Sequence, residues 1–167
     1  RALLSAERNI RRRVLELTLL NKTSAAAAST LDTEEVIDTI LDAVQRLLQV
    51  AQCALLVMNE KTQVLEIRAS RGLSPHYVNN LDLRDPDYQL PAYRAIASGK
   101  PVQVPDVRED ASLDPIRNII HTERYRSLLV IPLSTPHVPP AVLSIYRHHV
   151  YYFSEEEIGL VTSFANH

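Results

Sequence analysis

The sequence is poor in glycine, cysteine and long apolar runs, and each shortage excludes a class of protein. Three glycines among 167 residues cannot supply the glycine-rich loops that cradle phosphates through backbone amides in P-loop and dinucleotide-binding proteins. The one cysteine, Cys53, excludes an intrachain disulfide and a zinc site built from several thiolates, and it fits a reducing compartment, so we expect a cytoplasmic protein. The longest apolar stretches, such as residues 53–58, hold about half a dozen residues, so we expect neither a membrane span nor membrane contact.

The sequence also lacks an excess of charge of either sign. It has 18 Lys and Arg residues against 20 Asp and Glu residues, which gives a net charge of -2. A nucleic-acid-binding domain usually carries a basic excess on one face, so we expect no nucleic-acid partner. The apolar fraction of 46% and the charged fraction of 23% are typical of a globular chain, and the length suits one domain core.

Residues 1–29 are predicted to form a long helix that precedes the domain and belongs to a coiled coil. Apolar side chains recur there at heptad spacing, which is typical of a helix that pairs with another helix. We expect a parallel homodimer through this helix, in which paired asparagines fix the register. The alternative is that the same stripe folds back on the second helix or on the sheet. The expected interface consists of Leu3, Ile10, Val14, Leu17 and Asn21.

Residues 30–167 show the order of elements expected for an α+β domain with an antiparallel sheet. Asp32 is a good N-cap for an amphipathic helix that ends near Val50. Ser154 opens a last helix with a capping box, and this helix is still running at His167, so we expect the parent protein to continue. The predicted strands are residues 53–58, 64–70, 101–104, 127–133 and 141–147.

The long segment between the second and fourth predicted strands, residues 72–126, is irregular. Ser74-Pro75 and Asp114-Pro115 are cap-and-proline signals that start short helices, and Gly99 ends another. Such a segment must lie over one face of the sheet, where it is a natural wall for a ligand pocket.

Five phrases of the sequence together carry a family resemblance. They are Leu31–Leu41, Arg68–Leu73, Gly99–Asp106, Tyr125–Leu133 and Phe153–Glu157. In this order and spacing they resemble a GAF domain, the small-molecule sensor module of bacterial signalling proteins. The resemblance covers residues 30–167. It implies an antiparallel sheet of five or six strands, with the terminal helices on one face and short helices and loops that roof a pocket on the other.

The candidate ligand-binding residues are tyrosines and basic residues of the middle segment, together with one tyrosine of a central strand. Tyrosines supply contact area and a hydroxyl group, and a stripe formed by Arg117, His121 and Arg124 at helical spacing could meet an anionic group. The alternative is that the tyrosines pack the roof and the basic residues face water. The sequence leaves the identity of the small molecule unknown. The candidates are Tyr77, Tyr88, Tyr93, Arg117, His121 and Tyr146.

No residue pattern predicts catalysis or metal binding, so we do not expect an enzyme. His121–Glu123 resembles the start of a zinc-deaminase motif, but the downstream cysteine pair is missing. His148 and His149 are predicted to be adjacent on a strand and to point to opposite faces, so they would not chelate one metal. Methionine-sulfoxide reductases that share the fold use a cysteine pair, which a chain with one cysteine cannot form, so this activity is disfavoured. Bilin-binding relatives attach the pigment through a cysteine where this chain has residues 119–121, so we expect no covalent bilin.

The resemblance implies a non-catalytic, small-molecule-sensing regulatory domain of a larger signal-transduction protein, of histidine kinase or cyclic-dinucleotide enzyme type. A ligand would shift the packing of the sheet against the terminal helices, and these would pass the change to a downstream output domain. The alternative is a dimerisation scaffold whose pocket is vestigial and filled by side chains. A cavity of about 300 Å³ or more under the middle segment would favour the sensor.

Overall fold

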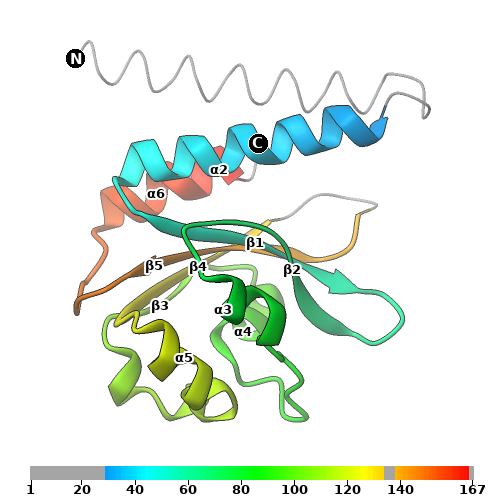
Figure 1. Ribbon diagram of the computed structural model, residues 1–167. Helices are drawn as coiled ribbons and strands as arrows, with labels where there is room; N and C mark the ends of the chain where they lie inside the picture. The colour runs from blue at the N-terminus through cyan, green and yellow to red at the C-terminus, as the bar shows by residue number, and fades with distance from the viewer. Residues whose placement is uncertain (1–28, 134–137, 166–167) are drawn as a thin grey trace.

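A computed structural model describes residues 29–133 and 138–165 of the chain. Five strands form one sheet in the order β2-β1-β5-β4-β3, and all neighbouring strands are antiparallel (Figure 1). This confirms the predicted α+β fold with its antiparallel sheet. The strands are β1 (Gln52–Asn59), β2 (Val64–Arg71), β3 (Val102–Val104), β4 (Ser127–Leu133) and β5 (Ala141–Arg147).

One face of the sheet is covered by the two helices α2 (Ser29–Leu48) and α6 (Glu155–Ala165), which lie in one layer above it (Figure 1). Leu41, Val44 and Leu48 recur at helical spacing on α2 and are buried against the sheet. The expected placement of these helices on a common face is therefore confirmed.

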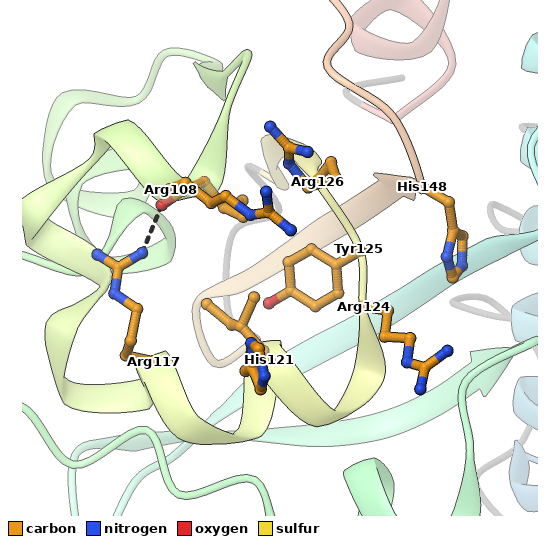
Figure 2. Close-up of a pocket in the computed structure, with 9 residues that line it drawn as sticks. Arg108, Arg117, His121, Arg124, Tyr125, Arg126 and His148 are labelled. Atoms are coloured by element: carbon orange, nitrogen blue, oxygen red, sulfur yellow. Dashed lines mark hydrogen bonds between the residues drawn. The ribbon is translucent and has the colours of Figure 1, made fainter.

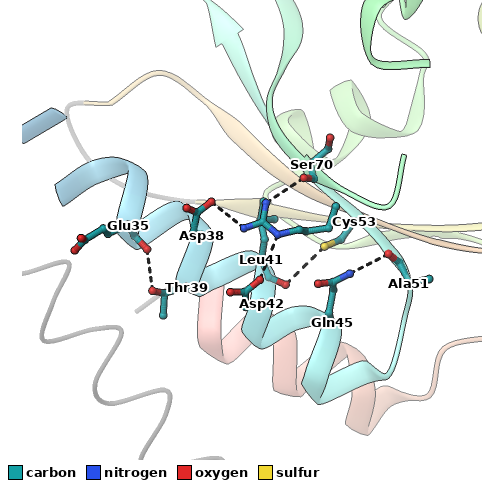
Figure 3. A network of polar contacts seen from close by, with 10 residues as sticks. Glu35, Asp38, Thr39, Leu41, Asp42, Gln45, Ala51, Cys53 and Ser70 are labelled. Atoms are coloured by element: carbon teal, nitrogen blue, oxygen red, sulfur yellow. Dashed lines mark hydrogen bonds and ion pairs between the residues drawn. The ribbon is translucent and has the colours of Figure 1, made fainter. Parts of the chain in front are cut away.

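Polar contacts fix α2 against the edge strand β2. The guanidinium of Arg71 donates to Asp38 at 2.8 Å and to Asp42 at 3.2 Å, and Arg68 pairs with Glu34. Figure 3 shows Asp38 and Asp42 on the side of α2 that faces the end of β2 at Ser70. These pairs are largely exposed, so their contribution to stability is small, but they define how the helix lies on the sheet.

The N-terminus of α6 carries the capping box that the sequence predicts. The amide of Glu157 donates to Oγ of Ser154 at 3.1 Å, and the amide of Ser154 donates to Oε1 of Glu157 at 2.9 Å. Each side chain thereby satisfies a backbone donor of the other residue, which fixes where α6 begins.

The opposite face of the sheet is covered by the middle segment (Figure 1). The alternation of β5 separates the two layers, because Leu143 and Ile145 face the α2 side, whereas Val142 and Tyr146 face the middle segment. The elements of this segment are α3 (Pro75–Asn80), α4 (Pro91–Ser98), the short 3₁₀ helices η2 (Val107–Glu109) and η3 (Ala111–Ile116), and α5 (Arg117–Glu123).

Three local predictions were wrong. Helix α2 begins at Ser29, so Asp32 lies inside the helix rather than at its N-cap. The segment around Asp114-Pro115 does not start an α-helix. It lies in a 3₁₀ helix, residues 111–116, whose N-cap is Asp110, and α5 begins only at Arg117. Strand β5 ends at Arg147, so His148 and His149 follow the strand instead of forming part of it.

The predicted N-terminal helix lies outside the described residues. This applies to the boundary between residues 1–29 and 30–167 and to the expected dimer residues, which therefore stay predictions. They are Leu3, Ile10, Val14, Leu17 and Asn21.

Candidate functional site

A cavity of about 400 Å³ lies at the end of the sheet, where β4 begins and β5 has ended. Its walls come from η2, α5, the turn between α5 and β4, and the residue that follows β5 (Figure 2). We call it the basic cavity, because six of its nine lining residues are Arg or His. The lining residues are Val107, Arg108, Arg117, Ile120, His121, Arg124, Tyr125, Arg126 and His148.

Short-range hydrogen bonds hold the two rims of the basic cavity in place. In η2, the carboxylate of Asp106 accepts from the amide of Arg108 at 3.0 Å, and the amide of Val107 donates to the carbonyl of Arg126 at 2.8 Å. On the other rim, Arg124 adopts a φ of 73° and ends α5, so the chain turns directly into β4. Both rims are therefore anchored to the start of β4.

Two arginines of the basic cavity are used by the fold itself. Arg117 donates to the carbonyls of Val107 and Asp110, both at 2.6 Å, and to the carboxylate of Asp114 at 2.8 Å. Arg126 donates to Asp106 at 3.1 Å, and this contact is the main reason why the pKa of Asp106 is lowered. These two guanidinium groups hold the rims and are already paired.

Three other basic side chains are not used in this way. Within residues 29–133 and 138–165, the side chains of Arg108, His121 and Arg124 make no hydrogen bond and no ion pair, and all three are exposed. Figure 2 shows that they come from both rims, with Arg108 on η2 and the other two on α5 and its end. His148 lines the cavity as well, and its Nε2 lies 2.8 Å from Oε1 of Gln52.

The tyrosines of the middle segment pack in the interior instead of around an open pocket. Tyr77, Tyr125 and Tyr146 form a cluster that we call the tyrosine core, with ring centroids 4.7–6.3 Å apart. The hydroxyl groups of Tyr77 and Tyr125 are hydrogen-bonded at 3.1 Å. Burial raises the pKa of all three phenols well above their ordinary value.

The free volume beside the tyrosine core is about 30 Å³, which is space for about one water molecule. This corrects the expectation of an open cavity under the middle segment, because apolar and tyrosine side chains fill that space. Tyr125 belongs to this interior and also lines the wall of the basic cavity.

The remaining two tyrosines lie elsewhere. Tyr93 is buried, with its hydroxyl donating to the carbonyl of Leu83 at 2.7 Å and accepting from the amide of Leu65 at 3.1 Å. Tyr88 is 49% exposed and packs edge-on against Tyr93. Neither residue lines the basic cavity.

Among the sequence-predicted candidates, the structure therefore brings together Arg117 and His121, and it does not place Tyr77, Tyr88, Tyr93 or Tyr146 beside them. Arg124 joins them, but as the left-handed end of α5 rather than as part of a helical stripe. Besides the apolar Val107 and Ile120, four lining residues were missed by the sequence analysis, and only the two arginines among them have a signal, the density of basic residues over residues 108–126. The missed residues are Arg108, Tyr125, Arg126 and His148.

Comparison with known proteins identifies the fold. A family model described as GAF domain matches residues 30–167. The chain belongs to the GAF domain family. No curated protein matches it. A domain of a protein assigned as a two-component sensor histidine kinase, from Sinorhizobium meliloti 1021, is 26% identical and has a TM-score of 0.63; the match covers 80% of this chain and 85% of that one.

Two more distant structures share the fold. The GAF domain of an Acinetobacter phosphoenolpyruvate-protein phosphotransferase is 17% identical with a TM-score of 0.68, and the match covers 99% of this chain and 89% of that one. The blue-light-absorbing form of the Thermosynechococcus elongatus PixJ GAF domain is 16% identical with a TM-score of 0.63, and the match covers 77% of each chain. Proteins with this domain thus include sensor and signalling proteins.

The basic cavity of this GAF domain lies next to a contact between the sheet and both terminal helices. The amide of Arg126 donates to the carbonyl of Arg147 at 2.7 Å. The guanidinium of Arg147 donates to the carbonyl of Leu48, the last residue of α2, at 2.8 Å, and lies 3.9 Å from Glu157 in the first turn of α6. It also lies 4.3 Å from the ring centre of Tyr151. Arg147 thus connects the cavity wall with both helices.

Cys53 lies far from this chemistry. It is fully buried on the α2 side of the sheet, and burial raises its pKa to about 12. Among the described residues, no three His, Cys, Asp or Glu side chains are grouped as metal ligands. No helix in that part of the chain combines the length and the apolar character that crossing a membrane requires.

Proposed function

We propose that this GAF domain is a non-catalytic, small-molecule-sensing regulatory domain of a larger cytoplasmic signalling protein. The observation that supports this function is the position of the basic cavity. Two of its lining residues, Arg126 and His148, adjoin Arg147 through a backbone hydrogen bond and the chain itself, and Arg147 contacts both α2 and α6. A ligand in the cavity would thus contact residues that adjoin Arg147, and Arg147 contacts both terminal helices.

We propose that Arg147 has two arrangements, because it contacts both terminal helices and still has one donor without a partner among the described residues. Its Nε is buried and has no hydrogen-bond partner among the described residues, while the same guanidinium donates to Leu48 and approaches Glu157. A small movement of residues 147–148 would exchange one of these contacts for another. A ligand that binds one arrangement more tightly than the other shifts the population, and the terminal helices carry the change to an output domain.

The output domain is proposed to be of the histidine kinase or cyclic-dinucleotide enzyme type. The likeness to a domain of a protein assigned as a sensor histidine kinase supports the first of these. The absence of a covalent bilin remains an expectation, supported by the burial of Cys53 on the α2 side of the sheet.

The test combines ligand discovery with a measurement at the helices. A metabolite mixture is screened by thermal unfolding, since a ligand of the native state raises the melting temperature by mass action. Amide hydrogen exchange is then compared with and without the hit. We expect changed protection at the end of α2 and the start of α6. The variant Arg147→Gln should bind the hit and lose this change, whereas Arg84→Gln, on an exposed loop, should behave like the wild type.

A dimerisation scaffold with a filled, vestigial pocket is the second candidate. The observation that favours it is the free volume of only about 30 Å³ beside the tyrosine core. If no compound of the screen binds, or if the bound compound leaves both helices unchanged in hydrogen exchange, the scaffold is the better description.

Both functions include the proposed homodimer through the N-terminal helix. The double variant Ile10→Asp and Leu17→Asp places two charges in the predicted seam, so it should yield a folded monomer in sedimentation velocity. A wild-type chain that is monomeric in the same experiment would contradict the dimer, and a folded-back helix would then explain the stripe.

A further inference from the structure

The basic cavity also indicates the chemistry of its ligand. We infer that it binds the terminal phosphate group of a small phosphorylated molecule, and that Arg108, His121 and Arg124 make the direct contacts. This inference rests on the proposed function, since it names the class of ligand that the regulatory domain senses.

The residues that line the basic cavity carry positive charge that no lining carboxylate balances. No Asp or Glu side chain is among the nine lining residues. Arg117 and Arg126 have carboxylate partners outside the lining, in Asp114 and Asp106. The guanidinium groups of Arg108 and Arg124 form no ion pair among the described residues, although they border the same space, and the charge of Arg108 contributes only in part to lowering the pKa of Asp106. An anion placed between them would supply the missing opposite charge.

The hydrogen-bond donors of Arg108, His121 and Arg124 surround the cavity from two sides. Arg108 approaches from η2, whereas His121 and Arg124 approach from α5 and its end, so the donors lie on two rims of one cavity (Figure 2). A guanidinium can donate two parallel hydrogen bonds to one group. A terminal phosphate has three acceptor oxygens and a charge of about -1.5 to -2 at neutral pH, so it can accept from several directions at once. A single carboxylate offers two oxygens in one plane and one charge.

The basic cavity is large enough for a small molecule, and part of its wall is apolar. Its volume of about 400 Å³ falls in the range of about 300–1,000 Å³ that is typical of small-molecule sites. Val107, Ile120 and Tyr125 form an apolar part of the wall, so there is room for an organic body next to the phosphate. The cavity therefore has room for the organic part of a phosphorylated molecule, while the phosphate contacts alone can be tested with an inorganic probe.

Hydrogen bonds of the fold hold the site open. Arg117 ties α5 to the carbonyls of Val107 and Asp110, and Arg126 is bonded to Asp106. The rims need not be ordered by the ligand, which lowers the entropic cost of binding. The sequence has too few glycines for a phosphate loop of backbone amides, and here side chains take that role.

Inorganic pyrophosphate is the probe for this class, in calorimetry and in NMR of the His121 imidazole, at constant ionic strength. We expect saturable binding with one site per chain and a shift of the His121 signals. The variants Arg108→Gln and Arg124→Gln should each weaken binding by about tenfold, the equivalent of one lost charge-assisted contact. Arg84→Gln is the matched control, because Arg84 is exposed and paired with Asp82 outside the cavity.

Three results would overturn the inference. One is that the binding of pyrophosphate does not saturate, or that Arg84→Gln weakens this binding as much as the cavity variants do. Another is that citrate, which is a carboxylate of similar charge, binds as tightly through the same arginines. The third is that a glutamate-rich peptide binds through them and pyrophosphate does not, which would make the cavity a docking site for an acidic protein segment.

The outcome also separates this inference from the proposed function. If an uncharged compound from the metabolite screen binds and changes hydrogen exchange in α2 and α6, while pyrophosphate does not bind, the regulatory function stands and the phosphate site does not. If pyrophosphate binds through Arg108 and Arg124 but the helices show no change, the phosphate site stands and the regulatory function does not.

Discussion

The middle segment, residues 72–126, takes part in two regions that differ in almost every property. Against the sheet it builds the interior around the tyrosine core, which is filled to within about 30 Å³. At the end of the sheet it builds the basic cavity, which is open and holds about 400 Å³. Tyr125 contributes to both, with its hydroxyl bonded in the interior and its ring at the cavity wall.

The difference shows how side-chain type decides what a roofing segment becomes. A tyrosine can bury its ring and still satisfy its hydroxyl group through a neighbour, as Tyr77 does with Tyr125. Guanidinium groups stay charged and need water or an anion, so Arg108 and Arg124 do not enter the interior. The tyrosines therefore close one space, and the arginines keep the other open.

The largest effect is expected from alkaline pH, which acts on the tyrosine core. Burial raises the pKa of Tyr77, Tyr125 and Tyr146 above the ordinary value of about 10. The neutral phenols thus contribute stability that is fully present below pH 10 and is lost as the pH rises above it, because only the unfolded chain ionises readily. We expect tyrosinate absorbance from these residues to appear together with the loss of far-ultraviolet circular dichroism.

Two results sharpen this test. The variant Tyr125→Phe should remove one phenol from the step that coincides with unfolding. Complete ionisation of all seven tyrosines with unchanged circular dichroism would contradict the packed interior.

The next largest effect is expected from opening the interior. Tyr77 is almost fully buried, so Tyr77→Ala should lower the free energy of unfolding by about 3–5 kcal/mol, as measured by urea unfolding. Tyr77→Phe keeps the ring and removes one hydrogen bond, so it should cost about 1 kcal/mol. Tyr152→Ala, at a side chain that is 74% exposed, is the control and should change little. Equal losses for Tyr77→Ala and the control would mean that the interior is not packed as described.

A moderate effect is expected at an arginine that the fold uses. Arg117→Ala removes the guanidinium that donates hydrogen bonds to two backbone carbonyls and to the carboxylate of Asp114. The free energy of unfolding should therefore fall by about 1.5–3 kcal/mol. Arg117→Lys should recover only part of this, because one ammonium cannot reproduce the fork of a guanidinium. Full stability in Arg117→Ala would show that the rims of the cavity are held by other contacts.

The smallest effect on stability is expected at the arginines without partners. Arg108→Gln and Arg124→Gln should change the free energy of unfolding by no more than about 0.5 kcal/mol, because these side chains make no hydrogen bond and no ion pair within the described residues. Urea unfolding in parallel with Arg117→Ala gives the comparison directly. A loss as large as that of Arg117→Ala would assign these side chains to the fold rather than to a ligand.

Most of the sheet and one of its two layers could be predicted from the sequence, for physical reasons. Strand β1 is apolar at every position from Cys53 to Met58 and lies inside the sheet, between β2 and β5, while β2 alternates and lies at the edge. The apolar stripe of α2 and the capping box at Ser154 are local patterns, so short-range physics suffices to recognise them.

The candidate site was less predictable, because it depends on contacts between distant residues. Nothing local distinguishes Arg117, whose guanidinium donates to the carbonyls of Val107 and Asp110, from Arg124, whose side chain makes no hydrogen bond within the described residues. His148 joins the cavity only because β5 ends one residue earlier. The tyrosines show the same limit, since a phenol can line a pocket or fill it, and the choice depends on the neighbour that its hydroxyl group meets.

The pairing of β1 with β5 has a consequence for synthesis of the protein. Cys53 lies opposite Ile145, so the central pair joins residues separated by most of the chain. While the ribosome is still adding residues 72–126, β1 has only the hairpin with β2, and an isolated hairpin is marginally stable. Contacts of such long range slow folding, and an unpaired apolar strand invites association between nascent chains. The sheet therefore closes late, once β5 has left the ribosome, and a chain that stops before residue 141 would leave the apolar strand β1 with an open edge.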